Sequence, residues 1–185
     1  DKVHMLGDTV PAVMAHCVYP TEEEFERMQH HKNLWIAHCP QSNISSSGGI
    51  APVKRYLRAG MHVGLGTDMA GNCTLSLLRA ITDAVHVSKA WWGFYERKGD
   101  THAARDVLTL PAAFYLATKG GGSFFGDVGS FEEGYVFDAV VLREGRLRDF
   151  VDRSAQERLE RLILMSDDRD IQAKYIAGRK VYENQ

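Results

Sequence analysis

The sequence has few cysteines, little charge bias and no long apolar run. Its 185 residues contain only Cys17, Cys39 and Cys73, widely spaced and in no C-x-x-C pair, so we expect reduced thiols in a cytoplasmic protein. No stretch approaches the roughly 18 apolar residues of a membrane helix, and no signal-peptide pattern is present. Since 22 basic residues face 24 acidic ones, binding to nucleic acid or to anionic lipid is not expected.

What is present is a repeated order of strand, loop and helix. Hydrophobic residues make up 44% and charged residues 25%, as in ordinary globular domains. Apolar runs at 11–16, 33–38 and 61–68 are each followed by polar residues and a helical pattern. Helices are expected after the capping box Thr21–Glu24, from Val53 to a stop at Gly60, and over Leu75–Trp91. This order is typical of parallel βα units.

After residue 100 the pattern changes. We expect a helix over 101–119, glycine-rich turns to 134, a buried strand over 137–142, an amphipathic helix over 154–164 and a hairpin over 171–182. Residues 41–49 are expected to form a polar loop, in which the serines match no nucleophile-elbow motif. The glycines at 64–66 and 120–122 lack the spacing of a dinucleotide fingerprint.

Three polar residues stand where apolar strands end: His16, His38 and Asp68. In α/β barrels the catalytic groups come from these ends, because the loops that follow the strands build one face. Imidazole and carboxylate groups suit a metal that activates water, and Asp68 could accept a proton from that water. Taken singly, each histidine could simply satisfy hydrogen bonds and Asp68 could cap a helix or turn. Because such a residue ends three successive strands, the catalytic interpretation and the purely structural one carry about equal weight.

The residues Ala37-His-Cys-Pro-Gln-Ser-Asn43 and Gly64-Leu-Gly-Thr-Asp68 resemble the last two barrel strands of the amidohydrolase superfamily, and Met14-Ala-His16 resembles the strand before them. The segments 117–122, 129–134 and 137–142 are similar to the exit from that barrel into a small β-sandwich. The resemblance implies an α/β fold: the C-terminal portion of a (β/α)8 TIM barrel, strands 6–8 with their helices, at 1–125. The return segment 126–185 would contribute strands to the β-sandwich.

Within the superfamily, segments 66–71 and 167–182 look most like the guanine deaminase branch. That likeness implies a purine substrate, zinc as cofactor, and deamination of guanine to xanthine by metal-activated water, with release of ammonia. Asp68 matches a metal ligand that also takes a proton from water. His16 matches a residue that contacts this water or binds a second metal. His38 and Asn43 match a motif that lines the site, on the substrate side or behind the reacting groups.

Two parts of the superfamily pattern are missing. There is no His-x-His pair, and the third residue after His16 is Tyr19 rather than a proton-shuttling Glu. A closed zinc site needs more than Asp68 and His16. We therefore expect this chain, which begins at Asp1, to be inactive alone. A missing N-terminal segment or second chain would complete the site and cover apolar surface, and a homodimer is expected.

Several alternatives remain open at this point. The substrate could be another aminopurine, a pterin, adenosine, S-adenosylhomocysteine or a triazine, and the metal could be iron. The chain could also be a non-catalytic remnant or an assembly subunit.

Overall fold

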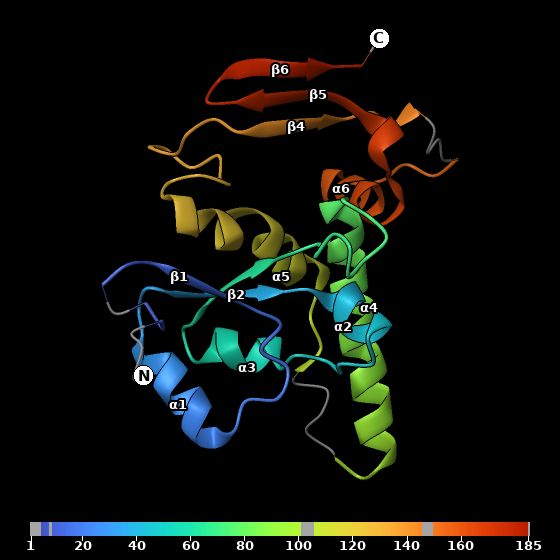
Figure 1. The fold of residues 1–185 in the computed structure, drawn as a ribbon. Helices are drawn as coiled ribbons and strands as arrows, with labels where there is room; N and C mark the ends of the chain where they lie inside the picture. Colours follow the sequence, from blue (N-terminus) through green and yellow to red (C-terminus); the bar gives the residue numbers. More distant parts are fainter. Residues whose placement is uncertain (1–4, 8, 101–105, 146–149, 185) are drawn as a thin grey trace.

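The computed structural model describes residues 5–7, 9–100, 106–145 and 150–184, which form two three-stranded sheets and surrounding helices (Figure 1). The first sheet is parallel, with its strands in chain order: β1 (Ala12–Ala15), β2 (Leu34–His38) and β3 (His62–Leu65). The second sheet is antiparallel, also in chain order: β4 (Ala139–Leu142), β5 (Ile171–Ile176) and β6 (Arg179–Glu183). The parallel sheet confirms the predicted βα rhythm.

The helices α1, α4, α5 and α6 begin at residues whose side chains cap them. Capping boxes at Thr21–Glu24 and Ser154–Glu157 start α1 and α6. The elements between the strands are α1 (Glu22–His30), α2 (Pro40–Ser45), α3 (Val53–Arg58), α4 (Leu77–Arg97), α5 (Leu110–Tyr115), the π-helical turn η2 (Leu116–Gly120), η3 (Ser123–Phe125), α6 (Ala155–Met165) and η5 (Asp168–Asp170). In Figure 1, α1 and α3 cover one side of the parallel sheet, and α5 lies between the two sheets.

The core lies between the parallel sheet and the helices α1 and α3. Leu34 and Ile36 of β2 and Val63 of β3 are almost fully buried there. They pack with Phe25 of α1 and Tyr56 of α3, whose rings are stacked with centroids 5.9 Å apart. Because side chains alternate along a strand, the neighbouring residues face the opposite side of the sheet.

The opposite side of the parallel sheet is closed by the segment that contains η2 and η3. The rings of Trp35 and His62, partners in the register, stack with centroids 4.5 Å apart. The indole Nε1–H of Trp35 donates to Ser123 Oγ at 2.9 Å. A Cβ on Gly64 would lie 2.8 Å from the Cα of Gly121, the residue that follows η2, so the chain there approaches the backbone of β3 too closely for any larger residue at position 64.

Three boundaries differ from those predicted. Residues 41–49 are not entirely loop, because Pro40 stands in the first turn of α2, where its missing N–H costs nothing. The helix α4 continues past Trp91 to Arg97, since no strong stop occurs before Gly99. The helix predicted over 101–119 begins only at Leu110, and residues 101–105 of it lie outside the described part of the chain.

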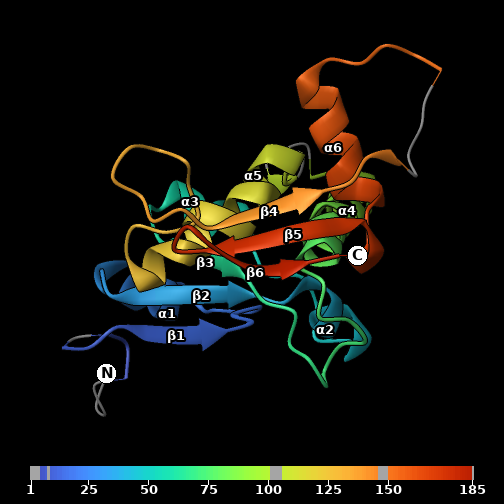
Figure 2. The ribbon, with the colours of Figure 1, turned by 90° about the horizontal axis from the view of Figure 1, so that it is seen from above.

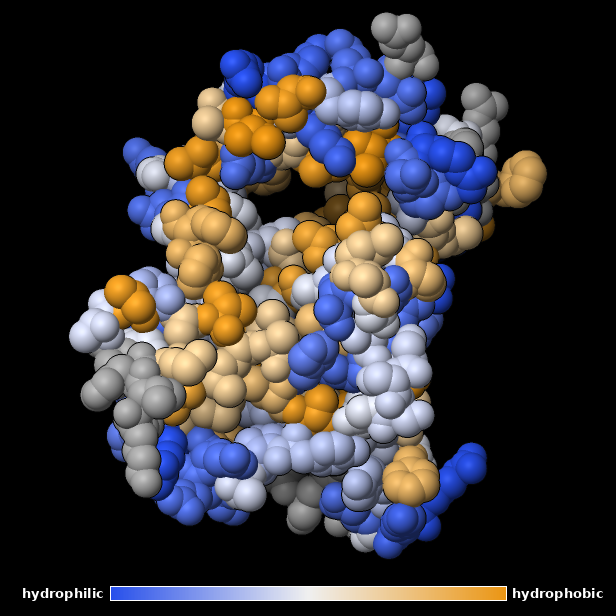
Figure 3. All heavy atoms as spheres, viewed as in Figure 1, coloured by the Kyte–Doolittle hydropathy of each residue, from blue (hydrophilic) through white to orange (hydrophobic). Residues whose placement is uncertain are grey.

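The strand predicted as buried over 137–142 is shorter and half exposed. It begins at Ala139, and Val140 and Val141 are 56% and 40% exposed. An apolar run predicts a strand but not what covers it, and β4 is an edge strand of a small sheet. Apolar side chains gather around a hollow between this sheet and the helices below it (Figure 3).

The predicted hairpin is confirmed. Its turn residues Ala177 and Gly178 have φ of 48° and 76°, as the two central residues of a type I′ turn require. Seen from above, the strand axes of the two sheets are roughly aligned, with β5 pointing opposite to the other labelled strands (Figure 2). Among the described residues, no helix has the length and apolar character needed to cross a membrane.

We expect Tyr56 to hold the turn that follows β1. Tyr56 is fully buried, and its hydroxyl donates to the carbonyl oxygen of Cys17. Tyr56→Phe leaves that carbonyl without its partner, so the free energy of unfolding should fall by about 1–3 kcal/mol. Denaturant titration measures this, with Tyr182→Phe on the exposed β6 as control. Equal effects of both substitutions would contradict the assignment.

Candidate active site

The ends of the parallel strands bring the predicted residues to one edge of the sheet. The hydrogen-bond ladder continues past β1, since the His16 N–H donates to Ala37 O at 2.9 Å. It also continues past β3, where the Gly66 N–H donates to His38 O at 2.9 Å. His16 therefore follows β1 directly, His38 ends β2, and Asp68 lies in the first turn after β3.

His16 and Asp68 face each other at this edge. His16 Nε2 lies 3.8 Å from Asp68 Oδ2, and the two side chains are 43% and 37% exposed. Each is held from behind by α2: His16 Nδ1 lies 2.7 Å from Asn43 Oδ1, and the Ser42 hydroxyl donates to Asp68 Oδ2. The arrangement presents one imidazole nitrogen and one carboxylate to an accessible space.

The backbone adopts an uncommon conformation at both positions. His16 and Cys17 have φ of 70° and 44°, and Asp68 and Ala70 have φ of 50° and 89°. Residues other than glycine rarely adopt this left-handed conformation, and each one that does so lowers the stability of the fold by about 1–3 kcal/mol. Residues held in this way cluster at functional sites, where neighbouring structure fixes them.

His38 occupies a different environment from His16 and Asp68. It is 1% exposed, and its Nδ1 has no hydrogen-bond partner among the described residues. Burial, and secondarily the proximity of His16, lowers its pKa from 6.5 to about 4. The cavity that it lines is walled mainly by the 50–53 segment and α4, together with Asp106 and Leu108. The structure thus places a neutral imidazole inside the core.

The neighbouring thiol is not a plausible nucleophile or thiolate ligand at neutral pH. Cys39 is 4% exposed, and burial together with the charge of Asp68 raises its pKa to about 11. A Cβ on Gly66 would lie 2.9 Å from Cys39 Sγ. Cys39 therefore fills the space beside β3 as a protonated, packed side chain.

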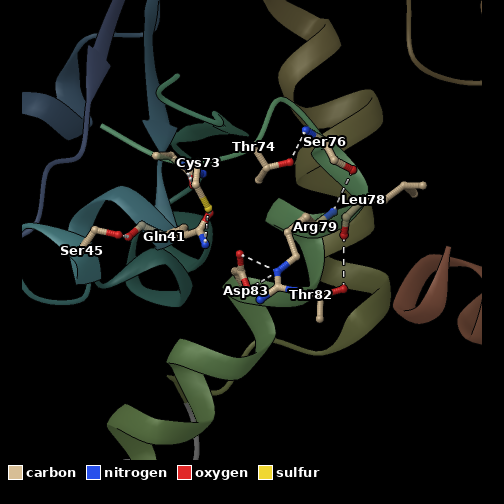
Figure 4. Close-up of polar contacts among 10 residues, drawn as sticks. Gln41, Ser45, Cys73, Thr74, Ser76, Leu78, Arg79, Thr82 and Asp83 are labelled. Carbon is tan, nitrogen blue, oxygen red and sulfur yellow. Dashed lines mark hydrogen bonds and ion pairs between the residues drawn. The ribbon is translucent and has the colours of Figure 1, made fainter. Parts of the chain in front are cut away.

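The loop after β3 contacts α2 and leads into α4 (Figure 4). Gln41 and Cys73 point toward each other, with the amide Nε2 at 3.5 Å from the thiol sulfur. Ser76 caps α4 through the Arg79 N–H, and the Arg79 guanidinium donates to Asp83 at 3.0 Å. The first contact joins the loop to α2, and the others define where α4 begins.

The donor atoms of His16 and Asp68 are of the types that bind zinc and lie at a suitable separation for two ligands of one ion. Zinc bonds to imidazole and carboxylate are about 2.0–2.2 Å long, so a tetrahedral ion holds two such ligand atoms about 3.4 Å apart. The 3.8 Å between Nε2 and Oδ2 is close to this value. The described residues contain no group of three or more histidine, cysteine or acidic side chains that could hold a metal. Further ligands would have to come from outside them.

Ser42 and Gly71 also contribute to the site, although neither was predicted as a site residue. A Cβ on Gly71 would lie 2.6 Å from Asp68 Oδ2 and 2.9 Å from Ser42 Oγ. The available signal for Ser42 was Pro40, which is favoured in the first turn of a helix and places Ser42 and Asn43 directly after β2. Gly71 lies within the segment 66–71 that carries the resemblance, but its place beside Asp68 and Ser42 was not predicted.

The fold, with its polar residues at the ends of parallel strands, agrees with a comparison to known protein families. The chain matches the profile of the amidohydrolase family over residues 1–181. It therefore belongs to the amidohydrolase family, and its mixed α/β fold is the fold of that family.

Relatives within the family include purine deaminases. The chain is 34% identical to the guanine deaminase of Mus musculus over 98% of its own length and 40% of the mouse protein. It resembles the crystal structure of guanine deaminase from C. acetobutylicum with bound guanine, with a TM-score of 0.87 and 40% identity over 98% of this chain and 41% of that one. The chain thus spans about two fifths of these relatives.

A metal-containing relative is also similar. The atrazine chlorohydrolase of Arthrobacter aurescens TC1, complexed with zinc, has a TM-score of 0.72 and 27% identity over 94% of this chain and 36% of that one. Zinc is thus present in solved structures of the family.

We expect the contact between Ser42 and Asp68 to tolerate only glycine at position 71. Gly71→Ala places a methyl group against both oxygens, so the free energy of unfolding should fall by about 1–3 kcal/mol. The control is Gly93→Ala, in an open position on α4, which should raise it by up to about 1 kcal/mol. Thermal or urea unfolding measures both, and stabilisation by Gly71→Ala would contradict the packing.

The buried His38 should make the protein acid-sensitive. Its folded-state pKa of about 4 lies below the unfolded value of 6.5, so the unfolded chain takes up a proton first as the pH falls. The free energy of unfolding should therefore decrease by roughly 3 kcal/mol between about pH 6.5 and pH 4. Urea titrations across that range measure the decrease. A folded His38→Gln variant should lack this contribution, and an unchanged pH dependence would contradict the assignment.

Proposed function

We propose that the protein containing this chain hydrolyses guanine to xanthine and ammonia, with His16 and Asp68 among its reacting groups. The observation that carries the proposal is the pairing of His16 Nε2 and Asp68 Oδ2 at the edge of the parallel sheet. The likeness to a guanine deaminase with bound guanine, at 40% identity, supports guanine as the substrate.

We also propose that the site takes zinc, with Asp68 and His16 as candidate ligands. Zinc, when bound, would supply a Lewis acid that makes water acidic enough to react near neutral pH. The donor types and the 3.8 Å separation fit such an ion, and a zinc-containing relative supports this choice of metal. At least one further protein ligand would be needed beyond these two.

The chain's own residues would direct the water and move its proton. The Asp68 carboxylate accepts a proton from the water as the new C–O bond forms at the amino-bearing carbon and the π electron pair of its C=N bond moves to the ring nitrogen. That proton then passes to the amino nitrogen. The ring nitrogen's electron pair re-forms the C=N bond as the bond to the amino group breaks and ammonia leaves, and the hydroxy product becomes xanthine when its proton moves to the ring nitrogen. His16, whose Nε2 faces Asp68, holds the water or binds the metal. His38 supports the site from the core.

The finer architecture belongs to the same proposal. The three parallel strands correspond to strands 6–8 of a (β/α)8 barrel, and β4–β6 to part of a small β-sandwich, with the division near residue 125. The exposed apolar side chains of β1 and β4 would face a further polypeptide segment. A homodimer and a cytoplasmic location stay predictions.

Substitution at Asp68 tests the proposed chemistry. Asp68→Asn keeps the shape of the side chain but weakens proton acceptance, so kcat for guanine deamination in the complete protein should fall by about 10²–10⁴-fold. Xanthine and ammonia formation are measured together. Asp152→Asn, at an exposed position, is the matched control and should leave kcat unchanged.

Three outcomes would contradict the proposal. The first is full activity of Asp68→Asn. In the second, the folded, zinc-loaded protein does not turn over guanine but hydrolyses adenosine, S-adenosylhomocysteine, a pterin or a triazine, and that compound would then replace guanine as the substrate. In the third, none of these compounds is turned over, which favours the non-catalytic alternative.

A further inference from the structure

Three consecutive residues of α2 contact the two loops that carry His16 and Asp68. Asn43 Oδ1 lies 2.7 Å from His16 Nδ1, and the Ser42 hydroxyl donates to Asp68 Oδ2. Gln41 contacts Cys73 at 3.5 Å, in the loop that follows Asp68 (Figure 4). We propose that this turn positions the site, and that Asn43 determines which nitrogen of His16 is available for metal or water.

The chemistry of imidazole makes the Asn43 contact decisive. A neutral ring carries one N–H and one lone pair, and the hydrogen bond at one nitrogen fixes the role of the other. Because Asn43 Oδ1 is an acceptor, Nδ1 carries the proton and the lone pair is on Nε2. That nitrogen is the one that faces Asp68. With the opposite tautomer, Nε2 would have no lone pair for a metal or for a water proton.

The turn is rigid enough to impose this choice. Ser42 and Asn43 are 5% and 3% exposed. The backbone carbonyl of Asn43 accepts from the Gly48 N–H at 2.7 Å, and the Ser46 hydroxyl donates to the carbonyl of Ser42 at 2.9 Å. The amide of Asn43 is thus presented to His16 from a fixed backbone.

The other end of the same amide indicates a positioning role rather than a purely stabilising one. Asn43 Nδ2 is buried and has no hydrogen-bond partner among the described residues. A buried unpaired donor costs about 1–3 kcal/mol. A side chain serving stability alone would pair both ends of the amide, whereas Asn43 pairs only its oxygen, with His16.

The experiment reads the tautomer of His16 directly. The complete protein is labelled with ¹⁵N-histidine, freed of metal, and its ring nitrogens are observed by NMR at a pH at which the ring is neutral. We expect the Nδ1–H form in the native protein and a shift toward Nε2–H in Asn43→Ala. Asn43→Asp keeps an acceptor and should retain the Nδ1–H form. Ser45→Ala, on the exposed side of α2, is the control and should change nothing.

Only the choice of Zn²⁺ as the metal in the next measurement rests on the proposed function. The Zn²⁺ dissociation constant, measured by competition with a chelator, should rise about 10–100-fold in Asn43→Ala and recover in Asn43→Asp. An unchanged tautomer in folded Asn43→Ala would overturn the inference, as would a shift that Asn43→Asp fails to reverse. A protein without guanine turnover that still shows the shift would support the positioning role and reject the proposed reaction alone.

Discussion

The parallel pairing of β1, β2 and β3 is the constraint on which the site depends. The register aligns Ala15, Ala37 and Gly64 across the sheet. One further backbone hydrogen bond on each side continues the ladder to the first residues beyond the strands. The height at which the chain leaves each strand is therefore fixed by backbone geometry. Side chains far apart in the sequence meet at one edge without needing strong attraction to each other.

Small residues in β3 and directly after it allow the supporting elements to come close. Gly64 leaves room for Gly121 at the end of η2, and Gly66 leaves room for the thiol of Cys39 at the start of α2. Since α2 follows β2 at once, its first turn can reach the loops on either side. His38, at the end of β2, is buried in the core, and this burial lowers its pKa to about 4.

The sequence was sufficient to predict features that depend on local chemistry. The capping box at Thr21–Glu24, the hairpin over 171–182 and the strand-end positions of His16 and Asp68 all follow from residue type and spacing. It was not sufficient for α2, because Ser and Asn are as typical of loops as of short helices. The exposure of β4 depends on what covers the sheet. The Asn43–His16 contact joins residues 27 apart in the chain, and only the register of the strands brings them together.

The left-handed backbone at His16 and Asp68 has a consequence for engineering this protein. Glycine adopts such φ values without steric cost, so a redesign that optimised stability alone would favour glycine at these positions. It would thereby remove the two side chains that define the edge of the sheet. At these two positions the residue that best suits the backbone angle is not the residue that the site needs. Stabilising substitutions in any thermostable version of this chain therefore have to be made at other positions.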